Sequence, residues 1–150
     1  MSSVADEVRP KARVYRGNAE CRERTRLFFK ELAVPNGLLP LKGIEEFGYE
    51  EETGFMWMKL KESITHRFRK IGKLVSYGNE ITAVIEKGKL KNLTGCKGKE
   101  LFLWITIKEM MVDYPTKGKV TFKIPSGLCK TFPSSVFEDT DDEDEEDVDG

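Results

Sequence analysis

The stretch Phe55-Met56-Trp57-Met58-Lys59-Leu60, with IEEFGY at residues 44–49 and the turn EETG at residues 51–54, decides the fold. Successive side chains of a strand point to opposite faces, so the two methionines and Leu60 share one face. Phe55, Trp57 and Lys59 share the other. Gly54 can adopt the positive φ that a tight turn requires. The sequence therefore predicts a β-hairpin whose methionine face is directed to the core.

Segments of strand character continue from this hairpin toward residue 137, separated by turn residues at 77–79, 87–88 and 115–118. They cover residues 65–76, 81–86, 89–93, 100–113, 119–124 and 128–132. Both faces of the longest segment are apolar where it begins, so we expect both to be covered there. About seven or eight short antiparallel strands need closure or a second sheet to protect their edges. The sequence thus predicts a mainly β domain with a barrel-like or closed sheet.

One helix is predicted before the strands, over residues 18–33. Cys21, Phe28 and Leu32 recur near one face at helical spacing, whereas the opposite face is net basic. The following linker, residues 37–43, contains three leucines. Three leucines are too apolar to leave in water, so we expect this linker to pack on the core.

The charge is divided unevenly along the 150 residues. Residues 138–150 contain ten acidic and no basic side chains, which leaves 25 basic and 16 acidic residues, a charge of +9, in residues 1–137. We therefore expect a flexible basic arm over residues 1–16, a single domain over 17–137 and a disordered acidic tail over 138–150. A basic domain suits an anionic partner, such as nucleic acid, an acidic membrane surface or its own tail. Nucleic acid is the less favoured of these, because the basic and aromatic stretch at residues 66–73 has only Phe68 at strand spacing, which is typical of a half-buried edge strand.

The cysteines and the hydropathy point to the cytoplasm. The sequence has three cysteines, Cys21, Cys96 and Cys129, and its first twenty residues lack the apolar run of a secretory signal. An odd number of cysteines without such a signal indicates reduced thiols. No segment approaches the roughly 20 apolar residues that span a bilayer.

Residues for catalysis are scarce. The one histidine, His66, lies among cationic neighbours and has no evident partner that would orient it as a base. The cysteines and the histidine are too widely separated to suggest a zinc site, and no nucleotide-binding fingerprint is present. We expect no cofactor, no metal and no catalytic site.

Short motifs in a fixed order connect the chain to a known family. They are Gly37-Leu38-Leu39-Pro40; the series Tyr77, Ile81, Ile85, Gly88, Leu90, Leu93 and Gly95; Lys97 with Lys99-Glu100-Leu101-Phe102-Leu103-Trp104; Asp113; Gly118, Val120 and Phe122; and Phe132-Pro133-Ser134-Ser135-Val136-Phe137. This ordered set, over about residues 27–138, resembles the plant family catalogued as domain of unknown function 538. The resemblance implies a compact β-barrel-like domain after a helix, a lipid-like or other amphiphilic ligand, and a link to stress or growth.

The chain departs from many members of that family, which look secreted and carry two cysteines. Here the region after the second hairpin strand reads Lys61-Glu62-Ser63-Ile64, without cysteine, and the end of the chain is acidic. These departures fit an intracellular member without disulfides.

These residues are compatible with three functions. The first is a non-enzymatic binding domain for an amphiphile. Its expected site is Trp57, Phe102 and Trp104 for the apolar part, with Arg67, Arg69 and Lys70 for an anionic head. The alternative is a regulatory protein-interaction module controlled by the acidic tail. An ester hydrolase acting on a lipid or pigment is the least favoured, because the sequence contains no recognisable nucleophile and base.

Overall fold

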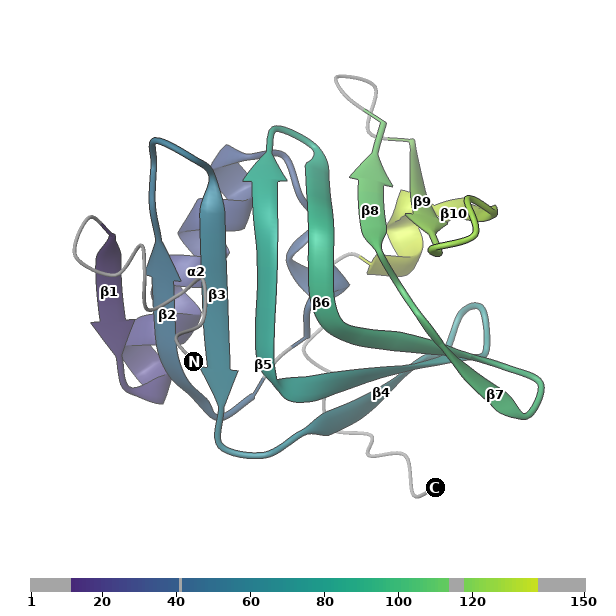
Figure 1. Ribbon diagram of the computed structural model, residues 1–150, viewed down its shortest axis with the longest axis horizontal. Helices are drawn as coiled ribbons and strands as arrows, with labels where there is room; N and C mark the ends of the chain where they lie inside the picture. The colour runs from purple at the N-terminus through teal and green to yellow at the C-terminus, as the bar shows by residue number, and fades with distance from the viewer. Residues whose placement is uncertain (1–11, 41, 114–117, 138–150) are drawn as a thin grey trace.

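The computed structural model describes residues 12–40, 42–113 and 118–137 (Figure 1). The acidic tail and the first eleven residues of the expected basic arm lie outside the described residues. The last residues assigned to that arm belong to the folded domain, because residues 13–16 form a strand. No helix in the described part of the chain has the length and apolar character that a bilayer crossing requires.

The described residues form ten strands, one α-helix and two short 3₁₀ helices. The helices are α2 (Asn18–Glu31), η2 (Asn36–Leu38) and η3 (Ser134–Phe137). The strands are β1 (Arg13–Arg16), β2 (Ile44–Tyr49), β3 (Phe55–Leu60), β4 (Ile64–Phe68), β5 (Lys73–Glu86), β6 (Lys89–Glu100), β7 (Leu103–Thr106), β8 (Glu109–Val112), β9 (Lys119–Lys123) and β10 (Cys129–Pro133).

The strands make one antiparallel sheet in the order β1-β2-β3-β5-β6-β8-β9-β10, with β4 added to β5 and β7 added to β6. The prediction of a mainly β domain with one preceding helix is confirmed. The prediction of a barrel-like or closed sheet of about seven or eight strands after the helix holds only in part. Nine described strands follow the helix, β1 precedes it, and the sheet is not closed.

The two longest strands bend, so that each pairs with different neighbours along its length. The upper half of β5 pairs with β3 and its lower half with β4, while β6 pairs first with β8 and then with β7 (Figure 1). Gly95 lies at the bend with φ +87°, and a Cβ there would stand 2.3 Å from the carbonyl oxygen of Glu80. Only glycine permits so close an approach of the two strands.

The gap that a barrel would close with hydrogen bonds is spanned here by side chains. Phe68 at the end of β4 contacts Phe137 of η3, with 5.0 Å between ring centroids. The ammonium group of Lys70 donates to the carbonyl oxygen of Ser135, at 3.2 Å. The lower half of the sheet therefore curls around an interior space without becoming a barrel.

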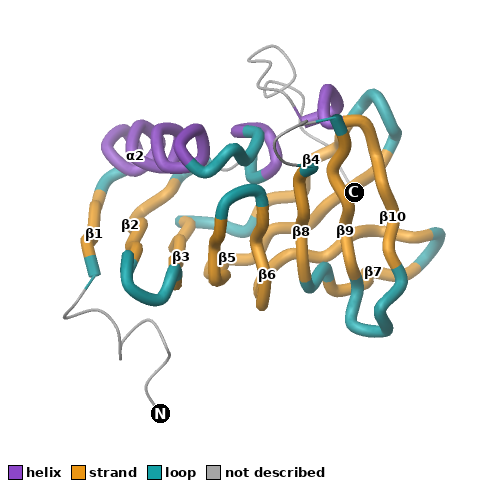
Figure 2. The backbone as a smooth tube through the Cα atoms, turned by 90° about the horizontal axis from the view of Figure 1, so that it is seen from above, coloured by secondary structure: helices purple, strands orange, loops and turns teal. Residues whose placement is uncertain are grey.

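Helix α2 covers one face of the sheet at the end that holds β1, β2 and β3 (Figure 2). Its buried residues are Cys21, Thr25 and Phe29, which agrees with the predicted apolar face to within one position. Leu38 and Leu39 of the linker are buried, as predicted. The hydroxyl of buried Tyr77 donates to the carbonyl oxygen of Leu38 at 3.0 Å and ties this linker to the sheet.

Strand β3 confirms the predicted hairpin and its faces. Its two methionines and Leu60 belong to the main core, whereas Phe55 and Trp57 form a second, smaller core on the other face. Gly54 has φ +79° in the turn. The Trp57 ring lies over Gly48 of β2, where a Cβ would come within 2.2 Å of a ring carbon.

The downstream segments differ from the prediction. The segment at 65–76 is two strands joined by a turn at residues 69–72, and the turn signal at 77–79 lies inside continuous β5. The segment at 100–113 comprises the hairpin turn at residues 101–102 and two strands, β7 and β8. Its first residues are not covered on both faces, because Leu101 and Phe102 are 87% and 93% exposed.

Candidate functional site

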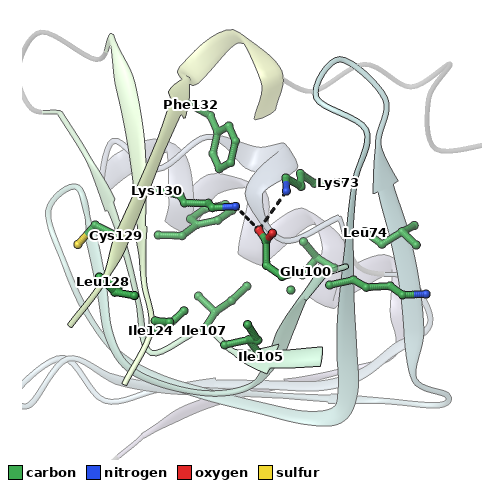
Figure 3. Close-up of a pocket in the computed structure, with 14 residues that line it drawn as sticks. Lys73, Leu74, Glu100, Ile105, Ile107, Ile124, Leu128, Cys129, Lys130 and Phe132 are labelled. Atoms are coloured by element: carbon green, nitrogen blue, oxygen red, sulfur yellow. Dashed lines mark hydrogen bonds and ion pairs between the residues drawn. The ribbon is translucent and has the colours of Figure 1, made fainter. Parts of the chain in front are cut away.

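The interior space of the curled sheet contains a cavity of about 340 Å³. It lies between the lower halves of β5 and β6 on one side and β9 and β10 on the other (Figure 3). The residues that give it an apolar lining are Val75, Ile105, Ile107, Phe122, Ile124, Leu128 and Phe132. A cavity of this size and lining is within the range of small-molecule sites in proteins.

Charged side chains from three strands meet at the mouth of this cavity. Glu100, at the end of β6, accepts a hydrogen bond from the Lys73 ammonium group at 3.0 Å. The same carboxylate oxygen accepts a second, short hydrogen bond from Lys130 of β10. Figure 3 shows both lysines pointing toward Glu100 from opposite sides. We name this group, Lys73, Glu100 and Lys130, the carboxylate clamp.

The clamp changes the acidity of its members. The hydrogen bond from Lys130, and secondly that from Lys73, hold the pKa of Glu100 below its ordinary value of 4.5. The hydrogen bond to Glu100 raises the pKa of Lys130 above 10.5. The clamp is therefore fully charged at neutral pH, with two ammonium groups on one carboxylate, and retains a net positive charge.

Gly98 of β6 leaves space in the cavity wall. In the sheet register it pairs with Val75 of β5 and with Ile105 of β7, both of which line the cavity. A Cβ at Gly98 would meet only the Ile107 side chain, at 3.7 Å, which is an ordinary van der Waals distance. A side chain at this position would therefore enter the cavity without straining the backbone.

The six residues predicted for ligand binding are not brought together around this cavity. Trp57 is fully buried on the far face of β3, where its indole N–H donates to the carboxylate of Glu46 at 2.7 Å. Its ring fills the second core. Trp57 is thus part of the packing of the sheet, and it does not line the cavity.

In contrast to the buried Trp57, Phe102 and Trp104 are exposed on the β6–β7 hairpin. Phe102 is 93% and Trp104 41% exposed. Trp104 lies opposite Lys99 in the β6–β7 register, with the Lys99 ammonium nitrogen 5.7 Å from the ring centroid. These two aromatic residues point outward from the domain.

The three predicted cationic residues belong to β4 and its turn. Arg67 is exposed on β4, opposite Leu74. Arg69 and Lys70 are exposed in the turn between β4 and β5. They lie near the curled half of the sheet, but the lysines at the mouth of the cavity are Lys73 and Lys130 instead.

Of the other reactive side chains in the described residues, Cys129 also borders this cavity. His66 lies on β4 with its ring 4.6 Å from that of Phe68. Burial raises the pKa of the Cys96 thiol to about 12, and Cys129 is exposed. Across residues 12–40, 42–113 and 118–137, no three His, Cys, Asp or Glu side chains gather where they could hold a metal ion.

Sequence reasoning missed the cavity for a physical reason. Its walls come from β5, β6, β7, β9 and β10, which are distant in the chain, and only the bend in β5 and β6 brings them together. Val120, Phe122 and Ile124 alternate with polar residues at the end of the chain's strand region, and this alternation is a usable signal because Phe122 and Ile124 line the cavity.

The comparisons with known proteins identify a family and no activity. The family model described as "Protein of unknown function, DUF538" matches residues 26–138. Neither a curated protein nor a solved structure matches the chain at a significant level. The match covers the last six residues of α2, strands β2 to β10, the cavity and the clamp. The chain therefore belongs to the DUF538 family of proteins of unknown function.

Proposed function

We propose that this domain binds, without catalysis, an amphiphile whose apolar part occupies the cavity and whose anionic head lies at the carboxylate clamp. The observation that carries this proposal is the convergence of Lys73 and Lys130 on one carboxylate at the mouth of an apolar cavity. Two lysines held at the spacing of a single carboxylate already have the arrangement that an anionic head group needs.

The clamp also explains how the site remains stable without a ligand. Glu100 satisfies both ammonium groups, so neither lysine is left without a partner beside apolar surface. A ligand carboxylate or phosphate would compete with Glu100 for the same donors. The net positive charge of the clamp favours an anionic head over a neutral one, and disfavours a cationic one.

The test compares ligands that share one tail and differ in the head: dodecanoate, dodecanol and dodecyltrimethylammonium. Titration calorimetry on the full chain is expected to rank their affinities in that order. Lys130→Met should weaken dodecanoate binding about tenfold, the equivalent of about 1.4 kcal/mol, and leave dodecanol binding unchanged. Glu100→Gln should strengthen dodecanoate binding, because it removes the competing negative charge.

Gly98 offers a variant that tests the cavity itself. Gly98→Leu should abolish binding of dodecanoate and dodecanol alike, because its side chain fills the space next to Ile107. Gly98→Ala is the matched control, since its Cβ fits at an ordinary contact distance and should preserve most binding. Binding that is equal in the wild type and in Gly98→Leu would exclude this cavity as the site.

A further inference from the structure

The β6–β7 hairpin carries an apolar tip that packing of the domain does not explain. Its four consecutive residues Leu101, Phe102, Leu103 and Trp104 are 87%, 93%, 67% and 41% exposed. In a two-residue turn, the leucine and phenylalanine side chains remain in water and lose the favourable free energy that burial in a core would provide. We name residues 101–104 the apolar tip.

The backbone of this tip is strained as well. Glu100 pairs with Leu103, which leaves Leu101 and Phe102 as the turn. Leu101 has φ +54°, a conformation that glycine or asparagine adopts readily and leucine rarely does. A leucine that is both strained and exposed indicates a role outside the folded domain.

Cationic side chains lie beside the tip on one face of the sheet. Arg67 pairs with Leu74, and Lys99 pairs with Trp104. Because Val75 pairs with Gly98, Leu74 lies beside Lys99 in the same register. These four residues form one row across β4, β5, β6 and β7, and residues in such a row share a face.

The neighbouring row on that face also contains a cation and no carboxylate. It contains Thr65, Ser76, Lys97 and Thr106. The two rows together hold three cations, Arg67, Lys97 and Lys99, and no carboxylate. By strand alternation this face is opposite the one that carries Val75 and Gly98, and Leu74 and Lys99 of the first row also border the cavity.

We infer that the apolar tip inserts into the interfacial region of an anionic lipid bilayer, with Arg67, Lys97 and Lys99 at its head groups. The tip is convex and protrudes at the end of the molecule remote from α2, a shape suited to a soft, flat surface (Figure 1). Tryptophan favours the lipid–water interface, and lysine or arginine close to it attracts acidic head groups. The inference does not depend on whether the cavity binds a ligand.

The tryptophans provide a direct readout. Trp104 is in the tip, whereas Trp57 is fully buried and donates to Glu46. With vesicles of phosphatidylcholine and phosphatidylserine, the full chain should cosediment and its fluorescence should shift to shorter wavelength. Trp104→Phe should remove the shift, and vesicles of phosphatidylcholine alone should bind the protein at least about tenfold more weakly.

The variant Leu101→Ser with Phe102→Ser should lower binding to the mixed vesicles at least about tenfold without unfolding the domain, because both side chains are exposed. Leu27→Ser on α2, where Leu27 is 52% exposed, is the matched control and should bind as the wild type does. Replacing Lys97 and Lys99 with serine should weaken binding most at low salt.

Absence of binding to the mixed vesicles would overturn the inference, as would equal binding by the tip variant and the wild type. The wild type could instead fail to bind vesicles and form a dimer that the tip substitutions dissociate. That result would mean that the tip contacts a second copy of the chain. In that case the inference would also be wrong.

Discussion

At the residue scale, buried polar groups in the described part of this domain have partners, and two of these pairs hold separate parts of the chain together. No buried side-chain nitrogen or oxygen among the described residues lacks a hydrogen-bond partner. Tyr77 connects β5 to the η2 linker through the carbonyl oxygen of Leu38. Trp57 and Glu46 connect β3 to β2. Loss of one partner in such a pair costs more than the bond itself, because the other is left desolvated.

Tyr77→Phe is expected to lower the free energy of unfolding by about 1–2 kcal/mol at neutral pH, because the Leu38 carbonyl oxygen loses its donor. Burial raises the pKa of the Tyr77 hydroxyl well above 10.0, so the unfolded chain ionises first as the pH rises. The wild type should therefore lose stability above about pH 10, and the difference from Tyr77→Phe should shrink there. Denaturant unfolding at neutral and alkaline pH measures both effects. If the difference in the free energy of unfolding between the wild type and Tyr77→Phe grew with pH, the buried Tyr77 hydroxyl would not be its cause.

Glu100→Gln tests the carboxylate clamp. The pKa of Glu100 is lowered in the folded state, so its stabilisation is present above the ordinary value of 4.5 and is lost as the pH falls through the lower folded value. Because the clamp is partly exposed, we expect a loss of only about 0.5–1 kcal/mol at neutral pH, and a smaller loss once the pH falls below 4.5. Glu23→Gln on the exposed face of α2 is the control and should be neutral at both. A deficit for Glu100→Gln that is undiminished in acid would mean that the clamp charge is not its cause.

At the scale of elements, the sequence predicts those strands whose turns contain glycine in the expected place. The hairpin of β2 and β3 follows from alternation and Gly54, and the turn between β5 and β6 from Gly88, both of which have positive φ. The β6–β7 turn could not be predicted, because Leu101 and Phe102 have no turn preference and continue an apolar run. Tertiary structure determines this hairpin: β7 pairs with the lower half of bent β6.

Paired glycine substitutions in the β6–β7 hairpin test this view of the turn. Leu101→Gly relieves a positive φ and should leave stability unchanged or raise it by up to about 1 kcal/mol. Leu103→Gly, in strand β7, should lower stability by about 1 kcal/mol. Thermal unfolding of the two variants provides the comparison. Equal destabilisation by both would show that the turn conformation is not strained.

At the scale of the whole molecule, the two ends of the domain differ in structure. Helix α2 covers the end that holds β1, β2 and β3 (Figure 2), whereas the cavity and the apolar tip belong to the curled end. The charge of the chain is divided as well, with +9 before residue 138 and −10 after it. The sequence predicts this division and the fold class, but the location of the cavity depends on the bend in β5 and β6.

Removal of residues 138–150 should strengthen binding to vesicles that contain phosphatidylserine. The truncation changes the formal net charge from −1 to +9, so attraction to an anionic surface increases. The gain should be large at low salt and fall at about 0.5 M salt, where the Debye length is only a few ångströms. Sedimentation with vesicles measures it, with phosphatidylcholine vesicles as control. Unchanged binding at low salt would show that the acidic segment does not oppose this association.

The central claim, that the cavity holds the tail of an anionic amphiphile, is tested most directly by methyl NMR of the full chain during titration with dodecanoate. The isoleucine methyl signals of Ile105, Ile107 and Ile124 should shift with saturation, because these side chains line the cavity. Those of Ile44 and Ile85, buried in the main core, should remain in place. No shift, or shifts confined to residues outside the cavity, would contradict the claim.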